Sequence, residues 1–405
     1  MTSPPAPASG ALASQGGAPV RTTFLPVAMP WIGEREKALV LEALESGWVT
    51  TGPRAHELGV RIAEIAGAKR GLAVNSCTAA LHLALVGLGI GEGDEVITTP
   101  YTFVASVNVI THVGARPVLA DVEPGTLCID PRAVERALSP RTRAILTVDY
   151  AGQPCDYDAI LTIARARSLP VIADAAHALG ASWRGRPVGS LATVTGFSFY
   201  AIKNLTTGEG GVVVTDDDPL MERMTVLSLH GMNRDAWKRY AATGSWYYEV
   251  TVPGFKYNLS DILAAIGVGQ LDRFAEFQRR RQELVAGYAS RLAGLEEVRL
   301  PAVREGAVHA WHLYPIALAL ERLTCDRSRV IEELRAENIG TTVNFIPVHM
   351  HPYYRQALES EPGRYPVAED AFRRAITLPL YPRMSEGDLD DVCAALRKVI
   401  THFRR

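Results

Sequence analysis

The chain has 405 residues, of which 47% are hydrophobic and 21% are charged, and its formal net charge is −2. A single hydrophobic core stops growing at about 250–300 residues, so this length predicts two domains. The near-zero charge gives no sign of a surface that binds nucleic acid or an anionic membrane, and no run of residues approaches the ~18 apolar positions that a membrane span needs.

Cysteine usage and the N-terminus indicate the compartment. The five cysteines are widely scattered and none forms a CxxC pair, which is typical of a reducing environment and gives no disulfide framework or metal site. The first residues are rich in Pro, Ala, Ser and Gly and lack the basic start and apolar centre of a signal peptide. We therefore expect residues 1–24 to form a disordered tail and the protein to be cytoplasmic.

Strand and helix patterns alternate along the first half of the chain. Helical patterns cover 34–46, 78–89, 102–114, 130–139, 156–168 and 219–231, and strand patterns cover 71–76, 94–100, 116–122, 143–150, 170–176 and 210–218. Alternation of this kind predicts an α/β fold, with a mostly parallel sheet sandwiched by helices. Ligands of such sheets bind beyond the carboxyl ends of the strands, so candidate functional residues are expected there.

The second half of the chain has a different pattern. Residues 231–257 are irregular and rich in aromatics, and residues 259–295 read as one long helical region. Beyond them, strand patterns over 310–318 and 340–347 mix with helical patterns over 327–338 and 386–403. This predicts a large domain over 25–270 and a smaller C-terminal α+β domain over 271–405.

Two ionisable residues follow predicted strands without an obvious partner. Lys203 has aromatic and aliphatic neighbours in "GFSFYAIKNLTTGEGG", and a desolvated lysine is an amine nucleophile toward carbonyls. Asp174 follows three apolar residues, where an unpaired carboxylate is costly, so it needs a cationic or hydrogen-bonding partner. His177 lies three residues further on and could support it, or could be merely structural. Glycines 208, 210 and 211 permit a ligand to approach the backbone near Lys203.

Two further features are weaker when taken alone. Ser76 and Thr78 lie between a strand and a helix, where hydroxyls and free N–H groups suit a phosphate or serve as simple helix caps. Phe103 follows another strand and is either a core residue or a flat surface for a ring. Together these features match pyridoxal 5'-phosphate, which needs a Schiff-base lysine, an anion beside its ring nitrogen and a phosphate site. P-loop and dinucleotide motifs do not follow any predicted strand.

Several longer stretches carry a resemblance to a known family. "ESGWVTTGP", "GIGEGDEVITTPYTFVAS", "DAAHALGA", "FSFYAIKNLTTGEGGVVVTDDD" and "HAWHLYPI" resemble the DegT/DnrJ/StrS sugar aminotransferases, which are fold-type I pyridoxal phosphate enzymes. The resemblance runs from about residue 25 to the C-terminus, and it looks closest to the branch that makes UDP-4-amino-4-deoxy-arabinose. It implies a homodimer with shared active sites, glutamate as amino donor, and a C4 or C3 keto group of a nucleotide-linked sugar as acceptor.

The resemblance also implies roles for cofactor-binding residues. Lys203 would hold the cofactor as a Schiff base, Asp174 would pair with its ring nitrogen, and His177 would lie beside the ring near the reacting groups. The remaining cofactor contacts would be Phe103 stacked on the ring, the Cys77 backbone with the Thr78 and Ser198 hydroxyls on the phosphate, and Asn258 reaching the phosphate of the neighbouring subunit.

The candidate substrate contacts are Tyr200, His349 and Trp246. The resemblance implies His349, which matches a histidine near the sugar in relatives. Trp246 lies in the aromatic stretch over 231–257, which could cover a nucleotide sugar or pack a dimer interface. Tyr200 stands where relatives frequently have histidine, and Cys77 replaces a smaller residue. Transamination of a cyclitol ketone by the same catalytic residues remains an alternative. A dehydrating branch of the family has histidine in place of the lysine, so Lys203 argues against it. A non-catalytic binding protein of this fold is expected to have lost Lys203, Asp174 or Thr78.

Overall fold

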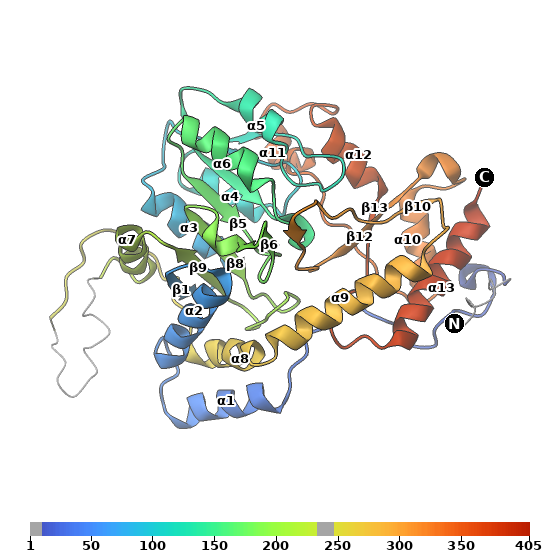
Figure 1. Ribbon diagram of the computed structural model, residues 1–405, viewed down its shortest axis with the longest axis horizontal. Helices are drawn as coiled ribbons and strands as arrows, with labels where there is room; N and C mark the ends of the chain where they lie inside the picture. The colour runs from blue at the N-terminus through green and yellow to red at the C-terminus, as the bar shows by residue number, and fades with distance from the viewer. Residues whose placement is uncertain (1–9, 233–246) are drawn as a thin grey trace.

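The computed structural model describes residues 10–232 and 247–405. Figure 1 shows a large domain built on a central sheet and a smaller domain that contains the C-terminus, with the long helix α9 (Phe274–Arg291) running between them. Among the helices of the described residues, none has the length and apolar character needed to cross a membrane. Those residues also contain no group of three or more His, Cys, Asp or Glu side chains placed to hold a metal ion.

The large domain is organised around a seven-stranded sheet. Its strands are β1 (Arg70–Val74), β2 (Glu95–Thr98), β3 (Arg116–Leu119), β4 (Thr142–Val148), β5 (Val171–Asp174), β8 (Val194–Ser198) and β9 (Gly211–Thr215), in the order β1-β9-β8-β5-β4-β2-β3. Strand β9 pairs antiparallel with β1 and β8, and all the other pairs are parallel. The predicted α/β fold with a mostly parallel sheet is therefore confirmed.

Helices cover both faces of this sheet. One face carries α3 (Cys77–Gly87), α4 (Ala105–His112) and α7 (Asp218–Ser228), and the other carries α2 (Pro53–Ala66), α5 (Pro131–Ala137), α6 (Tyr157–Ala166) and α8 (Asp261–Leu271), with α1 (Glu34–Glu45) outside α8. In β5, Ile172 packs under α3, whereas Val171 and Ala173 belong to the opposite core. Because alternate side chains of a strand point to opposite faces, a sheet covered on both sides needs continuous apolar strands.

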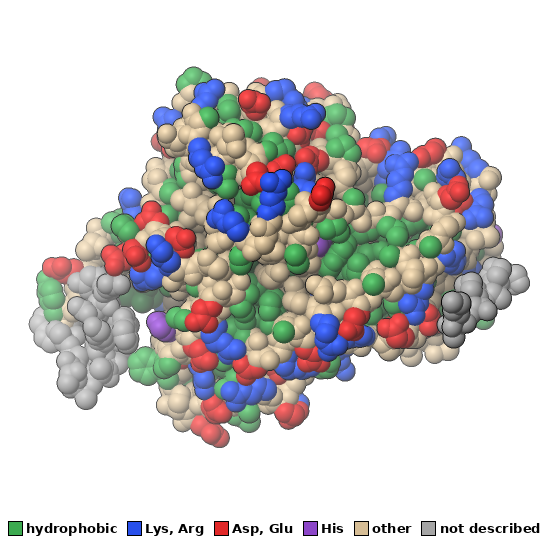
Figure 2. All heavy atoms as spheres, viewed as in Figure 1, with side chains coloured by type: hydrophobic (Ala, Val, Ile, Leu, Met, Phe, Trp, Pro, Cys, Tyr) green, Lys and Arg blue, Asp and Glu red, His purple; other side chains and the backbone are tan. Residues whose placement is uncertain are grey.

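The smaller domain has its own sheet and core. Its antiparallel strands are β10 (Val298–Arg299), β12 (Tyr314–Leu318) and β13 (Ala375–Leu378), and its helices are α9, α10 (Arg327–Ala336) and α13 (Glu386–Phe403). Helices α11 (Pro352–Ala357) and α12 (Pro366–Arg374) come from the same part of the chain, but their Tyr354 and Ala368 side chains belong to the core of the large domain. A third small sheet of β6 (Ser182–Trp183), β7 (Arg186–Pro187) and β11 (Ala307–Val308) joins the two domains. Figure 2 shows hydrophobic side chains in a hollow between β12 and α9, with charges of both signs interspersed over the rest of that face.

One predicted element is divided and another is wrong. Residues 259–295 are largely helical as predicted, but they form two helices, α8 and α9, with a break at Arg273, where φ is −116°. The reason is that α8 packs against α1 and α2 of the large domain, whereas most of α9 packs against α13 of the small one. Residues 340–347 are not a strand. They pair with β13 only at Thr342, and then turn so that Asn344 and Phe345 face the junction of the domains.

The N-terminal segment departs from the expected disordered tail. Residues 10–24 lie against the small domain, with the Leu12 side chain fully buried in its core. The backbone N–H groups of Ala13 and Val20 donate to the Glu337 carboxylate at 3.0 and 2.8 Å, and the Lys398 ammonium contacts the same carboxylate at 2.8 Å. Composition suggested disorder because it reports only local sequence, whereas the residues that hold this segment lie more than 300 positions further along the chain.

We predict that Glu337→Ala lowers the free energy of unfolding by about 3–5 kcal/mol, because it leaves the buried Lys398 ammonium without a counter-charge, with only the Ala18 carbonyl as partner, and leaves two N–H groups unpaired. Glu332→Ala, on the same helix but in an exposed ion pair, is the matched control and should change stability by less than about 0.5 kcal/mol. Urea denaturation of the two variants compares them. Equal stabilities would show that the contacts of Glu337 with the N-terminal segment and Lys398 do not stabilise the small domain.

Candidate active site

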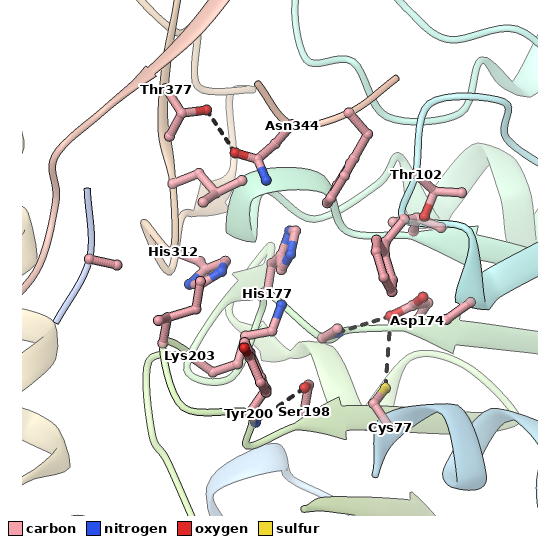
Figure 3. Close-up of a pocket in the computed structure, with 18 of the residues that line it drawn as sticks. Cys77, Thr102, Asp174, His177, Ser198, Tyr200, Lys203, His312, Asn344 and Thr377 are labelled. Atoms are coloured by element: carbon pink, nitrogen blue, oxygen red, sulfur yellow. Dashed lines mark hydrogen bonds between the residues drawn. The ribbon is translucent and has the colours of Figure 1, made fainter. Parts of the chain in front are cut away.

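The carboxyl ends of β4, β5 and β8 open into a cavity of about 390 Å³ at the junction of the two domains (Figure 3). The large domain contributes the first turn of α3 and the loops after these strands. The small domain contributes residues 342–345 and 377–380 with His312, and the N-terminal segment contributes Val27 and Ala28. The predicted residues that line this one cavity are Cys77, Thr78, Phe103, Asp174, His177, Ser198, Tyr200 and Lys203.

Lys203 lies on the turn that follows β8, where its backbone N–H donates to the Tyr200 carbonyl at 2.9 Å. The side chain reaches into the cavity (Figure 3). Burial lowers the pKa of the Lys203 amine to about 8, although the nearby Asp174 and Cys77 favour the protonated form. The amine is therefore far more often unprotonated at neutral pH than an exposed lysine, as a nucleophile or base requires.

The lowered pKa of Lys203 predicts how fast the protein stripped of cofactor captures added pyridoxal phosphate. Only the unprotonated amine attacks an aldehyde, so the rate of covalent capture should rise with pH and level off above a midpoint near 8. Stopped-flow absorbance between pH 6 and 10 measures this midpoint. A midpoint near 10.4, the value for an exposed lysine, would contradict the burial argument.

Asp174 ends β5 with its side chain almost fully buried. One carboxylate oxygen accepts from the Ser106 hydroxyl at 2.6 Å, and the other accepts from the Ala176 N–H at 3.1 Å and lies 3.9 Å from the Cys77 thiol. Burial raises the pKa of Asp174, and these hydrogen bonds oppose that rise. The three donors are all neutral, so the buried carboxylate would gain most from a cation that arrives in the cavity. Sequence reasoning missed Ser106, which no motif distinguishes.

The first turn of α3 lies next to Asp174 and can hold an anion. Ser76 is the helix cap, since its hydroxyl accepts the Ala79 N–H at 3.0 Å, so the capping interpretation holds for this residue. The exposed Thr78 and the half-buried Ser198 at the end of β8 line the cavity beside it. A side chain at Gly211 would come within 2.6 Å of the Cys77 nitrogen, so glycine is what lets β9 approach the helix start. Free N–H groups and the helix dipole at this point suit a phosphate.

His177 and Phe103 supply the cavity with rings. The Nδ1 atom of His177 accepts the Ala151 N–H at 3.2 Å, and its ring stacks on Phe345 at 5.8 Å between centroids. Burial and the positive charge of Lys203 hold the pKa of His177 well below its usual range, so the ring is neutral. Phe103 is 60% exposed and lines the cavity, so it is not a core residue and its ring is free to contact a planar ligand.

Two predicted residues do not line this cavity, and a third lies outside the described residues. His349 is buried and its Nε2 lies 3.1 Å from a Glu369 carboxylate oxygen, away from Lys203. The Asn258 amide donates to the Thr51 hydroxyl at 2.6 Å, outside the cavity of its own chain. Trp246 lies outside the described residues. Residues of the small domain that sequence reasoning did not assign, His312 and Asn344 among them, complete the wall, although His312 lies within the quoted stretch "HAWHLYPI".

These observations test whether the residues present fit pyridoxal phosphate. The buried Asp174 carboxyl group, oriented by the Ser106 hydroxyl and the Ala176 N–H, is a suitable partner for a pyridinium nitrogen. The start of α3 can hold a phosphate, and the Lys203 amine has the lowered pKa of an aldehyde-capturing lysine. All three lie in one cavity, so the residues fit the cofactor. When bound, pyridoxal phosphate supplies an electron sink for a carbanion at the substrate carbon.

Comparisons with known proteins agree with this interpretation. The model of the DegT/DnrJ/EryC1/StrS aminotransferase family matches residues 30–397. The spore coat polysaccharide biosynthesis protein SpsC of Bacillus subtilis is 47% identical over 381 residues, which cover 94% of this chain and 98% of SpsC. Two solved structures are also similar. One is the pyridoxamine phosphate form of Spr1654, a sugar aminotransferase of Streptococcus pneumoniae, with a TM-score of 0.88 and 34% identity over 93% of this chain and 99% of that one.

The other is DesI in the presence of its TDP-sugar product, with a TM-score of 0.85 and 30% identity over 95% of each chain. Spr1654 has also been solved in its pyridoxal phosphate form, with a TM-score of 0.87.

Proposed function

The chain belongs to the DegT/DnrJ/EryC1/StrS aminotransferase family and is a pyridoxal phosphate-dependent transaminase, and we propose that it moves the amino group of glutamate to a C4 or C3 keto group of a nucleotide-linked sugar. The observation that carries this proposal is the single cavity in which the Lys203 amine, the Asp174 carboxylate and the start of α3 meet. The TDP-sugar product of DesI supports a nucleotide-linked acceptor. None of the relatives described above is named for UDP-4-amino-4-deoxy-arabinose, so that closer likeness stays a prediction.

Lys203 has two successive tasks in this proposal. It first holds the cofactor covalently, and once an amino donor has displaced it, the free amine takes a proton from the substrate carbon and returns it. A pKa of about 8 suits both tasks, because the amine can lose and regain a proton near neutral pH. His177, neutral and held by the Ala151 N–H, orients a ring N–H in the same cavity.

Asp174 would supply the negative charge opposite the ring nitrogen of the cofactor. Ser106 and the Ala176 N–H orient its two oxygens and favour the ionised form against the cost of burial. That charge would keep the ring nitrogen of the cofactor protonated, on which its capacity as an electron sink depends. Phe103 would cover the ring, and Thr78 and Ser198 would donate to the phosphate.

We also propose a homodimer in which Asn258 completes the site of the partner. In its own chain the Asn258 side chain lies outside the cavity, where Thr51 holds it. Large apolar side chains are exposed close in sequence to Thr51 and Asn258, namely Trp48, Val49, Val250 and Val252. Others are exposed where they line the cavity, namely Phe103, Tyr200 and Ile202. Contact with a second copy would bury apolar surface of this kind.

Mixed dimers test the shared site. If Asn258 acts in the partner's site, a dimer of one Lys203→Ala subunit and one Asn258→Ala subunit contains one wild-type site. An equal mixture, of which half the dimers are mixed, should then recover about a quarter of wild-type activity. Dimers of either variant alone are the controls. Activity no higher than that of the two parent variants would mean that Asn258 does not act across the interface.

An absorbance spectrum before and after addition of glutamate tests the reaction. Conversion of the pyridoxal band to the pyridoxamine band is expected, and 4-keto and 3-keto nucleotide sugars should then restore the first band. Cyclitol ketones belong in the same panel because they represent the second candidate function. Return of the band with a cyclitol ketone alone would replace the sugar proposal with that alternative, and a band unaffected by glutamate would exclude glutamate as donor.

A further inference from the structure

Hydrogen bonds assign the proton on the neutral ring of His177. The Ala151 backbone N–H donates to Nδ1 at 3.2 Å, and since a backbone nitrogen only donates, Nδ1 carries the lone pair. The pKa of His177 is held well below its usual range, so the ring has one proton. That proton is therefore on Nε2, and His177 offers a donor at this end of its ring.

A second histidine next to it has the opposite arrangement. The Nδ1 atom of His312 lies 3.2 Å from Oδ1 of Asn204. The orientation of the Asn204 side-chain amide is fixed by its Nδ2 atom, which donates to the Ala310 carbonyl at 2.7 Å and to the Gln278 side-chain oxygen at 3.3 Å. Because both of those partners only accept, Oδ1 must face His312, whose Nδ1 then carries the proton. Burial holds the pKa of His312 well below its usual range, so its Nε2 keeps a lone pair.

Both Nε2 atoms open to the cavity. The two rings lie 4.4 Å apart between centroids, and Figure 3 shows them beside the Lys203 side chain. Within residues 10–232 and 247–405, neither Nε2 has a hydrogen-bond partner, and neither is sealed from the solvent as Nδ1 of His349 is. One wall of the cavity therefore presents one ring N–H and one ring lone pair, side by side.

We propose that His312 is a positioning residue for Lys203: when the lysine side chain turns toward it within their shared cavity, the unprotonated Nε2 of His312 accepts an N–H of the amine and so directs the amine lone pair toward the bound ligand. The inference rests on the proposed function, in which Lys203 carries the cofactor. Of the two imidazoles only His312 can accept, since Nε2 of His177 already has a proton. Each Asp174 oxygen already accepts a hydrogen bond, from Ser106 and from Ala176, whereas Nε2 of His312 accepts none. The Lys203 amine makes no hydrogen bond within the described residues, so its N–H groups are available to this acceptor.

The tautomers can be measured directly. In the full-length protein without cofactor, labelled with ¹⁵N-histidine, we expect His312 to show a protonated Nδ1 and an unprotonated Nε2, and His177 to show the reverse. Single His→Gln variants assign the two spectra. A proton on Nε2 of His312 would overturn the proposal whatever the enzyme does.

A second experiment separates positioning of Lys203 from a merely structural role. The rate at which the cofactor-free protein captures pyridoxal phosphate depends on the Lys203 amine, whereas the affinity for pyridoxamine phosphate, which forms no bond to the lysine, does not. We expect His312→Phe to slow capture about tenfold, as for one lost hydrogen bond, with the affinity for pyridoxamine phosphate changed less than about twofold.

Two further variants keep this test decisive if the phenylalanine variant misfolds. His312→Gln places an amide near the position of Nε2 and should restore capture to within about threefold of wild type, whereas His312→Asn reaches only the Nδ1 position and should stay about tenfold slow. Equal rates for the Gln and Asn variants, or a parallel loss of pyridoxamine phosphate affinity, would contradict the proposal. Failure of the wild-type protein to attach the cofactor through Lys203 would instead refute the proposed function, and leave the tautomer assignment standing.

Discussion

Lys203→Ala is expected to abolish transamination, with a loss of at least about 10⁴-fold in kcat, because no other described lysine lines the cavity to replace it as cofactor anchor and base. The variant should fold normally. Burial of a lysine costs free energy, as the fall of its pKa to about 8 shows, so removal of the amine takes away an unfavourable term.

Absorbance, turnover and thermal unfolding of Lys203→Ala should be measured together. We expect the covalent absorbance band to be missing, while pyridoxamine phosphate still binds and the melting temperature is within a few degrees of wild type. Lys37→Ala, which removes an exposed surface lysine, is the control and should leave all three unchanged. Substantial turnover by Lys203→Ala would mean that another amine performs the chemistry.

Asp174→Asn is expected to lower kcat by about 10³-fold, because the replacement keeps the shape of the side chain but removes the charge opposite the ring nitrogen of the cofactor. In the wild type the Ser106 hydroxyl donates to the Asp174 carboxylate at 2.6 Å. In the variant it would face either the NH₂ group or the neutral oxygen of the amide. Affinity for pyridoxal phosphate should fall as well, since loss of one member of a buried charge pair costs about 2–5 kcal/mol.

An analogue of pyridoxal phosphate with carbon in place of the ring nitrogen makes this prediction specific. Wild type should bind the analogue and the Asp174→Asn variant should bind it equally well, because the lost interaction involves the nitrogen alone. Asp218→Asn, in an exposed ion pair with Arg70, is the control for a general loss of charge. An equal fall in affinity for cofactor and analogue would show that Asp174 supports the fold rather than the ring.

Local sequence pattern was enough for much of the large domain. Continuous apolar strands such as β2 and β4, which are followed by the helices α4 and α6, can be buried only in a sheet covered on both faces, so the architecture followed from pattern. Lys203, Asp174 and Thr78 were found because their residue types conflict with their apolar or strand-end surroundings, and such a conflict is visible in the sequence. The resemblance to a family then linked them to one cofactor.

Contacts between distant segments were beyond the reach of pattern. Ser106 meets Asp174 and Asn204 meets His312 only after the chain folds, across 68 and 108 positions, and no local signal marks either pair. The same holds for residues 10–24: Leu12 is buried in the core of the small domain, and Glu337 and Lys398 of that domain bind the backbone of the segment. Composition and periodicity report what a segment can bury by itself. Burial, tautomer and pKa depend on which partners the fold brings near, and the chemistry of the cavity therefore appears only in three dimensions.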